Sequence, residues 1–265
     1  KSALLDINVE TYKNKQHIKG IVRGFSFSAI TGYKKCEIPT ANYLKQLEYI
    51  KQQKPDNFHY LQVNDSEIYN IANDLTTKGY GTIVVTYDFS KYQKAVKNIK
   101  NISNFELYNL SDFTGINTLI FAPEETVDYS AYENVILLDY PICDGFIYSF
   151  NNSKVYVVNN KYNHKVFENI SCERNVFGIY HNAIKNAEIK GVSATNQFEY
   201  FVKIKALNPQ FKNLSYVQFC FVVMVLKELN IIEIDTNFSI KFTKVKSELT
   251  NSTIYNNANL LTKIN

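Results

Sequence analysis

The chain has 265 residues, of which 45% are hydrophobic and 20% are charged, the composition of a folded protein long enough for two domains. Its formal net charge is +4, and only two of its 29 basic residues are arginine, Arg23 and Arg174. Lysine offers phosphates a point charge but lacks the planar fork of arginine, so the composition argues against base-specific reading of duplex DNA as the main task.

The charge is distributed unevenly along the chain. Residues 1–55 carry 10 basic and 4 acidic side chains, residues 56–189 carry 10 and 16, and residues 190–265 carry 9 and 5. A basic start and end around an acidic middle predicts different partners for different parts of the chain. The alternative is random variation on solvated faces.

Four cysteines, Cys36, Cys143, Cys172 and Cys220, show no C-x-x-C spacing. We expect free, mostly buried thiols in a cytoplasmic protein, and no zinc site. The sequence contains neither an apolar stretch of membrane-spanning length nor a signal peptide, which predicts no membrane partner. Because the chain does not begin with Met, we expect it to be part of a longer protein.

The first residues read as two strands. Residues 5–10 alternate apolar and polar side chains, residues 12–15 form a turn, and residues 16–25 follow as a second strand. Two strands alone seldom form a stable unit, so this hairpin is predicted to belong to a larger sheet.

The same hairpin is rich in basic and aromatic residues, which suits a groove for single-stranded DNA, where bases stack on rings and phosphates meet lysine. A solvated strand face is the alternative. The candidate DNA-binding residues are Tyr12, Lys13, Lys15, Lys19, Arg23 and Phe25.

A helix is predicted from Thr40 to Lys54, with an apolar side formed by Tyr43, Leu44, Leu47 and Ile50 and an end before Pro55. Strands and helices then alternate. Helical spacing occurs over Ser66–Lys78 and Ser90–Ile99, with Ser66 and Ser90 as expected N-caps. The expected strands are Phe58–Val63, Thr82–Tyr87, Glu106–Leu110, Thr118–Phe121, Asn134–Asp139 and Val155–Val158. Short apolar strands separated by helices predict a mostly parallel, Rossmann-like, doubly wound α/β domain.

The loops after these strands carry little recognisable chemistry. No phosphate-binding glycine motif is present, and Gly79 and Gly81 precede a strand, so they read as a helix end and a turn. Asp139 and Asp144 form a candidate carboxylate pair; the alternative is an aspartate at a strand end and a turn aspartate before Gly145. The four histidines lack metal-ligand spacing.

The last third predicts three helices followed by a β-ribbon, the order of a winged-helix module. The helices are Glu173–Ala187, Asn196–Leu207 and Ser215–Leu229, and the ribbon pairs Ile231–Glu233 with Ser239–Phe242. A winged helix that reads DNA presents a polar face on its third helix. Residues 217–226 are apolar nearly all round, so the third helix is predicted to be buried, and major-groove reading is not expected.

The layout of residues 171–255 resembles the C-terminal end of RecJ, the bacterial single-stranded-DNA-specific exonuclease of the DHH family, and the hairpin of residues 1–26 resembles the end of its OB-type domain. The resemblance implies three parts: the end of an OB-type β-domain and linker (1–39), the doubly wound domain (40–165) and the winged-helix module (166–265). The D-H-H signature and the other Asp-rich motifs are absent. The resemblance therefore implies a non-catalytic region with no cofactor of its own, while the catalytic core of an intact exonuclease would hold Mn or Mg.

The resemblance also implies partners in DNA repair and recombination. They are single-stranded DNA and single-strand-binding protein, whose acidic tail ends in an apolar residue and suits lysine or arginine beside an apolar pocket. The candidate partner-binding residues are Arg174, Lys203, Lys205 and Lys212.

Two other readings stay open. Residues 112–117 and 135–141 resemble the second RecA-like lobe of superfamily 2 helicases, which predicts a degenerate lobe in another repair or replication factor. No arginine lies between residues 24 and 173, so ATP chemistry is not expected there. The third reading is an independent enzyme that uses the loop of Asp139 and Asp144.

Overall fold

The computed structural model describes residues 2–12, 15–26, 37–79, 81–110, 116–124, 127–159, 164–211 and 213–263, with the backbone alone for residues 2–26. The chain divides into two compact units, residues 1–36 and residues 37–265.

The first unit is a β-hairpin. Strand β1 (Ser2–Tyr12) pairs antiparallel with β2 (Lys15–Ser26), and the register shifts between Leu4 and Leu5. The two predicted strands are confirmed, and both are longer than expected.

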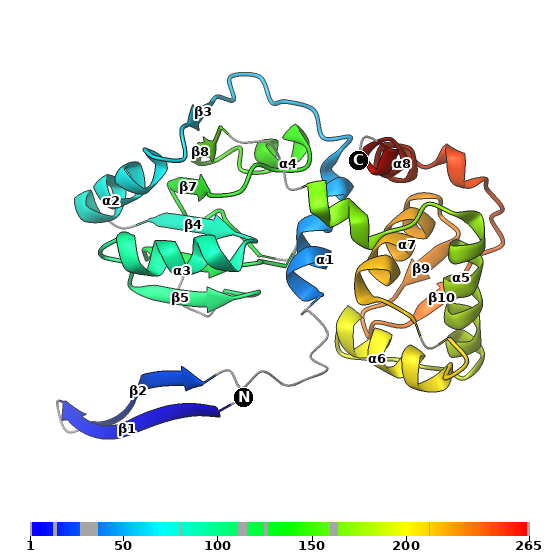
Figure 1. The fold of residues 1–265 in the computed structure, drawn as a ribbon, viewed down its shortest axis with the longest axis horizontal. Helices are drawn as coiled ribbons and strands as arrows, with labels where there is room; N and C mark the ends of the chain where they lie inside the picture. Colours follow the sequence, from blue (N-terminus) through cyan, green and yellow to red (C-terminus); the bar gives the residue numbers. More distant parts are fainter. Residues whose placement is uncertain are drawn as a thin grey trace. The chain divides into compact units, whose positions relative to one another are not determined.

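The second unit contains a six-stranded sheet in which every pair is parallel (Figure 1). The strand order is β3-β8-β7-β4-β6-β5. The strands are β3 (Tyr60–Val63), β4 (Thr82–Thr86), β5 (Asn104–Leu107), β6 (Thr118–Phe121), β7 (Asn134–Leu137) and β8 (Lys154–Val158). The predicted parallel α/β architecture is confirmed. Every residue of β4, β6 and β7 is buried, as expected for a sheet covered on both faces.

Helices cover the two faces of this sheet separately. On one face α2 (Ile68–Lys78) and α3 (Phe89–Asn98) pack on alternate strand residues such as Val84. On the other face α4 (Asp144–Tyr148) packs on the intervening residues, among them Ile83 and Val85. The alternation follows from the two-residue period of a strand. The five-residue α4 was not predicted, because so short a helix has no readable periodicity.

A short helix begins the second unit. The predicted single helix of residues 40–54 is instead α1 (Ile38–Leu44) continued by a 3-10 helix, η1 (Lys45–Tyr49). The backbone oxygen of Gln46 accepts a hydrogen bond from Cys143 Sγ at 3.2 Å, a contact that competes with a regular helical bond.

The C-terminal part contains the expected helices and ribbon in the expected order. They are α5 (Arg174–Ile189), α6 (Gln197–Leu207), α7 (Tyr216–Glu228), β9 (Ile232–Ile234) and β10 (Ile240–Phe242). The 3-10 helices η2 (His164–Asn169) and η3 (Leu249–Asn251) precede and follow this group, and the helix α8 (Thr253–Lys263), which was not anticipated, ends it.

Helix α7 is the centre of the C-terminal core. Every residue from Tyr216 to Leu226 is buried, against α1, α5, α6, α8 and β9. The interpretation of this helix as buried is confirmed. Its one buried amide, Gln218, accepts from the Ser171 backbone N–H at 2.6 Å and donates to the Ser171 oxygen at 3.0 Å.

Glu228, the last residue of α7, joins three segments. Its carboxylate accepts hydrogen bonds from Ser252 Oγ at 2.5 Å and from the Ile254 backbone N–H at 3.1 Å, at the start of α8. Lys51 Nζ, just after η1, lies 2.6 Å from the same carboxylate. A carboxylate at a helix N-terminus is stabilised by the free amides and the helix dipole.

Candidate functional site

The carboxyl ends of β4 and β7 mark the place where an open α/β sheet binds ligands. β4 and β7 are neighbours, and the chain leaves them in opposite directions, through α3 to β5 and through α4 to β8. Ligands of such folds bind where the strand order reverses in this way. A ligand site is therefore expected at this crevice.

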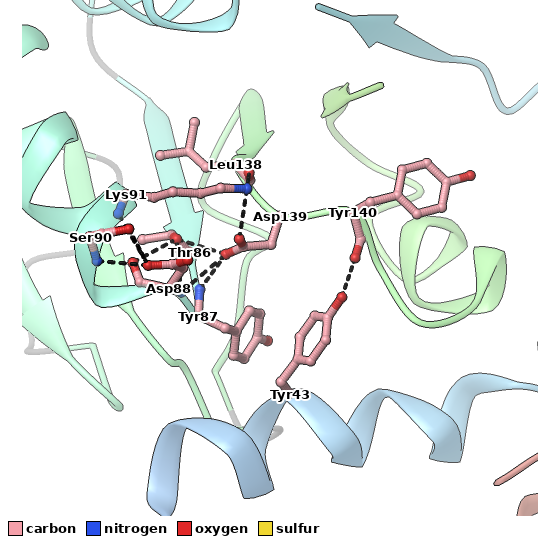
Figure 2. Close-up of polar contacts among 9 residues, drawn as sticks. All are labelled: Tyr43, Thr86, Tyr87, Asp88, Ser90, Lys91, Leu138, Asp139 and Tyr140. Carbon is pink, nitrogen blue, oxygen red and sulfur yellow. Dashed lines mark hydrogen bonds and ion pairs between the residues drawn. The ribbon is translucent and has the colours of Figure 1, made fainter. Parts of the chain in front are cut away.

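Asp139, which follows β7, fills the crevice (Figure 2). Its Oδ2 accepts hydrogen bonds from Thr86 Oγ1 at 2.7 Å, from the Tyr87 backbone N–H at 2.5 Å and from that of Asp88 at 3.3 Å. Its Oδ1 lies 3.0 Å from Lys91 Nζ. Successive backbone amides with a hydroxyl and an ammonium group form the kind of site that binds an anion, and here an internal carboxylate occupies it.

Lys91 is held by the same cluster. Besides its ion pair with Asp139, its Nζ donates to the Leu138 backbone oxygen at 2.6 Å. Both contacts bind the Lys91 ammonium group to the loop after β7. The arrangement stabilises the sheet edge and pairs both carboxylate oxygens of Asp139 within the chain.

Asp88 organises the start of α3. Its Oδ1 accepts from the Ser90 backbone N–H at 2.7 Å, from Ser90 Oγ at 2.6 Å and from the Lys91 backbone N–H at 3.4 Å. Burial raises the pKa of Asp88, but these hydrogen bonds outweigh it and the pKa is lowered.

The prediction of Ser90 as the N-cap is wrong, because Asp88 receives the free amides of the first turn. The prediction of Ser66 for α2 is also wrong, since Glu67 stands at that cap without a side-chain bond.

Asp144 and Asp139 are held by different elements. It is the first residue of α4, whereas Asp139 is ion-paired to Lys91. Burial and the nearby Asp144 carboxylate raise the pKa of the Tyr140 phenol. The contacts of Asp139 favour the alternative of an aspartate at a strand end over a carboxylate pair.

Helix α1 lies against the same sheet edge, beyond the arrowheads of β4 and β5 (Figure 1). Asn42 Nδ2 donates to the Ala122 oxygen at 2.8 Å, the Tyr43 hydroxyl donates to the Tyr140 oxygen, and Gln46 Oε1 accepts from the Ile142 N–H at 2.9 Å. The two backbone oxygens and the backbone amide that α1 and η1 bind in this way belong to the loops after β6 and β7.

Aromatic packing closes the crevice further. The rings of Tyr43 and Tyr87 lie 5.1 Å apart, and burial raises the pKa of the Tyr87 phenol. The edge that binds ligands in related architectures is here an internal interface with α1. Sequence reasoning missed this role of α1, because no pattern in residues 38–49 indicates which distant loops they contact.

No group of three metal-ligating side chains is found among the residues that the structure describes. Two cavities, of about 390 and 270 Å³, lie at the opposite, amino-terminal edge of the sheet. They share Asn151 and Ser153 and are lined by polar turn residues with Phe58, His59 and Tyr129. Neither lies at the crevice between β4 and β7.

The predicted DNA-binding side chains fall outside what the structure describes. Tyr12, Lys15, Lys19, Arg23 and Phe25 have a described strand backbone without side chains, and Lys13 lies in the turn outside the described residues. Their assignment stays a prediction.

The predicted partner-binding cations are placed differently from one another. Lys203 forms an ion pair with Glu199 at 2.8 Å and donates to the Ser193 oxygen at 2.8 Å. Lys205 donates to the Leu214 oxygen at 3.0 Å. Arg174 is exposed at the start of α5, and Lys212 lies outside the described residues. Two of the four cations are therefore already bound within the chain.

The thiols are less buried than expected. Cys220 is buried, while Cys143 and Cys172 are half-buried and free, and Cys36 lies outside the described residues. Burial raises the pKa of the Cys143 and Cys172 thiols, which makes them poor nucleophiles.

Searches for similar proteins find no match among protein-family models, curated proteins or solved structures. Among the described residues, no helix is both long enough and apolar enough to cross a membrane.

Proposed function

We propose that this chain is the non-catalytic C-terminal region of a RecJ-type 5'-3' single-stranded-DNA exonuclease in DNA repair and recombination. It contacts single-stranded DNA through the β1–β2 hairpin and docks single-strand-binding protein through its C-terminal part. In this proposal residues 1–39 end an OB-type domain and residues 166–265 form a winged-helix module.

One observation carries the non-catalytic part of the proposal: Asp139 and α1 occupy the crevice where the sheet would bind a ligand. A domain whose ligand-binding edge is filled by its own side chains is suited to a scaffold. The order of α5, α6, α7 and the β9–β10 ribbon supports the winged-helix part. The buried α7 argues against major-groove reading by such a module.

A nuclease assay tests the non-catalytic claim. The purified chain is incubated with labelled single-stranded DNA and Mn²⁺, and no shortening of the DNA is expected. Robust exonuclease activity that survives repurification would contradict the proposal.

A peptide-binding assay tests the partner claim. A fluorescent peptide with several aspartates and an apolar C-terminal residue is titrated with the chain, and binding is expected to weaken in Lys203→Glu. The matched control is Lys78→Glu on α2, because both lysines pair with an acidic residue four positions earlier. Absence of binding by the unchanged chain would refute this role.

The alternative is a degenerate helicase-like lobe with a winged helix in another DNA repair or replication factor. The six parallel strands and the aspartate after β7 favour it. Detectable ATP affinity in equilibrium dialysis would move the assignment toward this alternative. The lack of an arginine between residues 24 and 173 argues against it.

A further inference from the structure

Helix α8 is attached to the C-terminal core by few buried side chains. Of its eleven residues, Ile254 and Ala258 are buried, whereas Tyr255 and Leu261 are only partly buried. By contrast, every residue of α7 from Tyr216 to Leu226 is buried. Segments with few buried apolar contacts open locally while the rest of a protein stays folded. We therefore expect α8 to open more readily than α7.

The first turn of α8 is held by a carboxylate from another helix. Glu228, at the end of α7, accepts hydrogen bonds from the backbone amides of Thr253 at 3.2 Å and Ile254 at 3.1 Å. It also accepts from Ser252 Oγ at 2.5 Å, and that hydroxyl oxygen accepts from the Tyr255 amide at 2.9 Å. The first amides of a helix have no partner within the helix. Here their acceptors depend on the one side chain of Glu228.

Lys51 adds a cation to the same carboxylate. Its Nζ lies 2.6 Å from Glu228 Oε1, and the two side chains are 64% and 14% exposed. An ion pair with one exposed partner contributes little by itself, so the hydrogen bonds to the first turn of α8 are the stronger constraint. Loss of the Glu228 carboxylate removes the acceptor of the Thr253 and Ile254 amides and favours detachment of α8.

The Cys172 thiol lies where α8 covers the core. The Tyr255 hydroxyl donates to the Cys172 backbone oxygen at 2.9 Å, and the Tyr255 ring lies 5.7 Å from that of Phe177. Burial raises the pKa of the half-buried Cys172 thiol, and a hydrogen bond with the Thr262 side chain opposes that effect. Residues from both ends of α8 therefore contact Cys172.

We propose that α8 is a strap that detaches as a unit from the folded core, that Glu228 holds it closed, and that the closed strap shields the Cys172 thiol. The open form is a minor state of the folded chain, because α7 keeps its contacts with α1, α5, α6 and β9 when α8 leaves. Opening uncovers Cys172 together with Phe177, which is 4% exposed in the closed form. The inference uses only the contacts of α8 and is independent of the proposed function.

Alkylation of the whole, folded chain with N-ethylmaleimide tests this proposal. Mass spectrometry of the peptides gives the rate at each cysteine. In Glu228→Ala, Cys172 is expected to react at least about tenfold faster than in the unchanged chain, the effect of losing charged hydrogen bonds at a helix start. Tyr255→Phe, which removes only the bond to the Cys172 oxygen, is expected to accelerate the reaction about twofold to tenfold.

Two controls separate opening of the strap from general unfolding. Cys143, which is also half-buried and free and stands at the start of α4, should react at one rate in all variants. Glu248→Ala is the matched substitution, because Glu248 lies close to α8 in the sequence but forms no capping bond at η3. It should leave the alkylation of Cys172 unchanged.

Hydrogen exchange supplies a second measurement. In Glu228→Ala the amides of α8 should lose protection while those of α7 keep it. Equal alkylation of Cys172 in Glu228→Ala, Tyr255→Phe and the unchanged chain overturns the proposal. An equal acceleration at Cys143, or a joint loss of protection in α7 and α8, also overturns it, because either result means that α8 does not open as a separate unit.

Discussion

At the scale of single residues, Asp139 is the polar centre of the sheet edge. It accepts from Thr86, Tyr87 and Asp88 and pairs with Lys91. Removing one partner of a shielded ion pair leaves the other charge and its donors unsatisfied, which costs more than the pair contributes on balance. The carboxyl group that the sequence offered as half of a candidate pair is thus held by partners within the chain.

We expect Asp139→Ala to lower the free energy of unfolding by about 3 kcal/mol, because Lys91 and two backbone amides lose their acceptor. Urea denaturation measures this. The control is Asp74→Ala, whose pair with Lys78 is exposed and 3.5 Å long and should change stability by less than about 0.5 kcal/mol. Equal effects of the two changes would show that the Asp139 cluster contributes no special stability.

Glu228 should make stability depend on pH. Burial raises its pKa, but the hydrogen bonds from Lys51, Ser252 and Ile254 outweigh burial, so its pKa is lowered below the usual 4.5. Its stabilisation is complete above the usual pKa and is lost as the pH falls through the lowered pKa of the folded state. At pH 7 we expect Glu228→Gln to cost about 1–3 kcal/mol.

The pH series supplies the check on this prediction. Thermal unfolding at stepwise lower pH should bring the variant and the unchanged chain together as Glu228 becomes protonated. A difference that persists unchanged below pH 3, roughly a unit under the ordinary range of glutamate, would mean that the charge of Glu228 is not responsible.

At the scale of elements, the contact of η1 with α4 depends on a glycine. A Cβ atom built on Gly145 would lie 1.9 Å from the Tyr49 backbone oxygen. Backbone cannot yield as a flexible side chain does, so Gly145→Ala must separate η1 from α4. We expect a loss of about 2–4 kcal/mol in urea denaturation, in the range of overpacked or disrupted cores.

Gly178 in the middle of α5 is the matched control for this change. Nothing lies within 4 Å of a Cβ atom there. Gly178→Ala should therefore stabilise the chain by about 0.5–1 kcal/mol through helix propensity. If Gly145→Ala also stabilised the chain, the close approach of η1 and α4 would be refuted.

Sequence reasoning placed elements better than it placed their contacts. Strand β6 begins and ends as predicted, since its four residues, Thr118 and three apolar ones, are buried on both faces. Strand β5 ends earlier than predicted, because Tyr108 adopts a φ of 70°, a left-handed conformation that an aromatic residue rarely takes. Helix α8 was missed because only Ile254 and Ala258 are buried in it, too few for a readable pattern.

The candidate site depended on contacts far apart in the sequence. Asn42 and Ala122 are 80 residues apart, and Gln46 and Ile142 are 96 apart. No local pattern encodes such pairs, because propensity and periodicity report only on neighbours along the chain. The aspartate after β7 was therefore located from the sequence, and its four partners were not.

At the scale of the whole molecule, α1 and η1 connect the sheet to the C-terminal helices of the second unit. Leu44 and Leu47 are buried in the core around α7, while Tyr49 packs on the core beneath α4. A segment shared by two cores couples their unfolding, so residues 37–265 should unfold in one transition.

Leu44→Ala tests this coupling. The side chain has no exposed surface, and its truncation should cost about 2–5 kcal/mol. In hydrogen exchange, the amides of the sheet and those of α7 should lose protection together. Leu61→Ala, at a residue 60% exposed, should change neither. Loss of protection in α7 alone would show that the two cores unfold separately.

The buried amide of Gln218 has a consequence for the uniqueness of the fold. A helix that is apolar on all sides, such as α7, can rotate about its axis with little change in buried apolar area, because every side of it presents apolar side chains. The paired bonds between Gln218 and Ser171 permit only one rotation. We expect Gln218→Leu to keep most of the stability and to broaden the methyl resonances of the core in NMR spectra. In this chain Gln218, together with Glu228 at the end of the same helix, favours one among similar packings of α7.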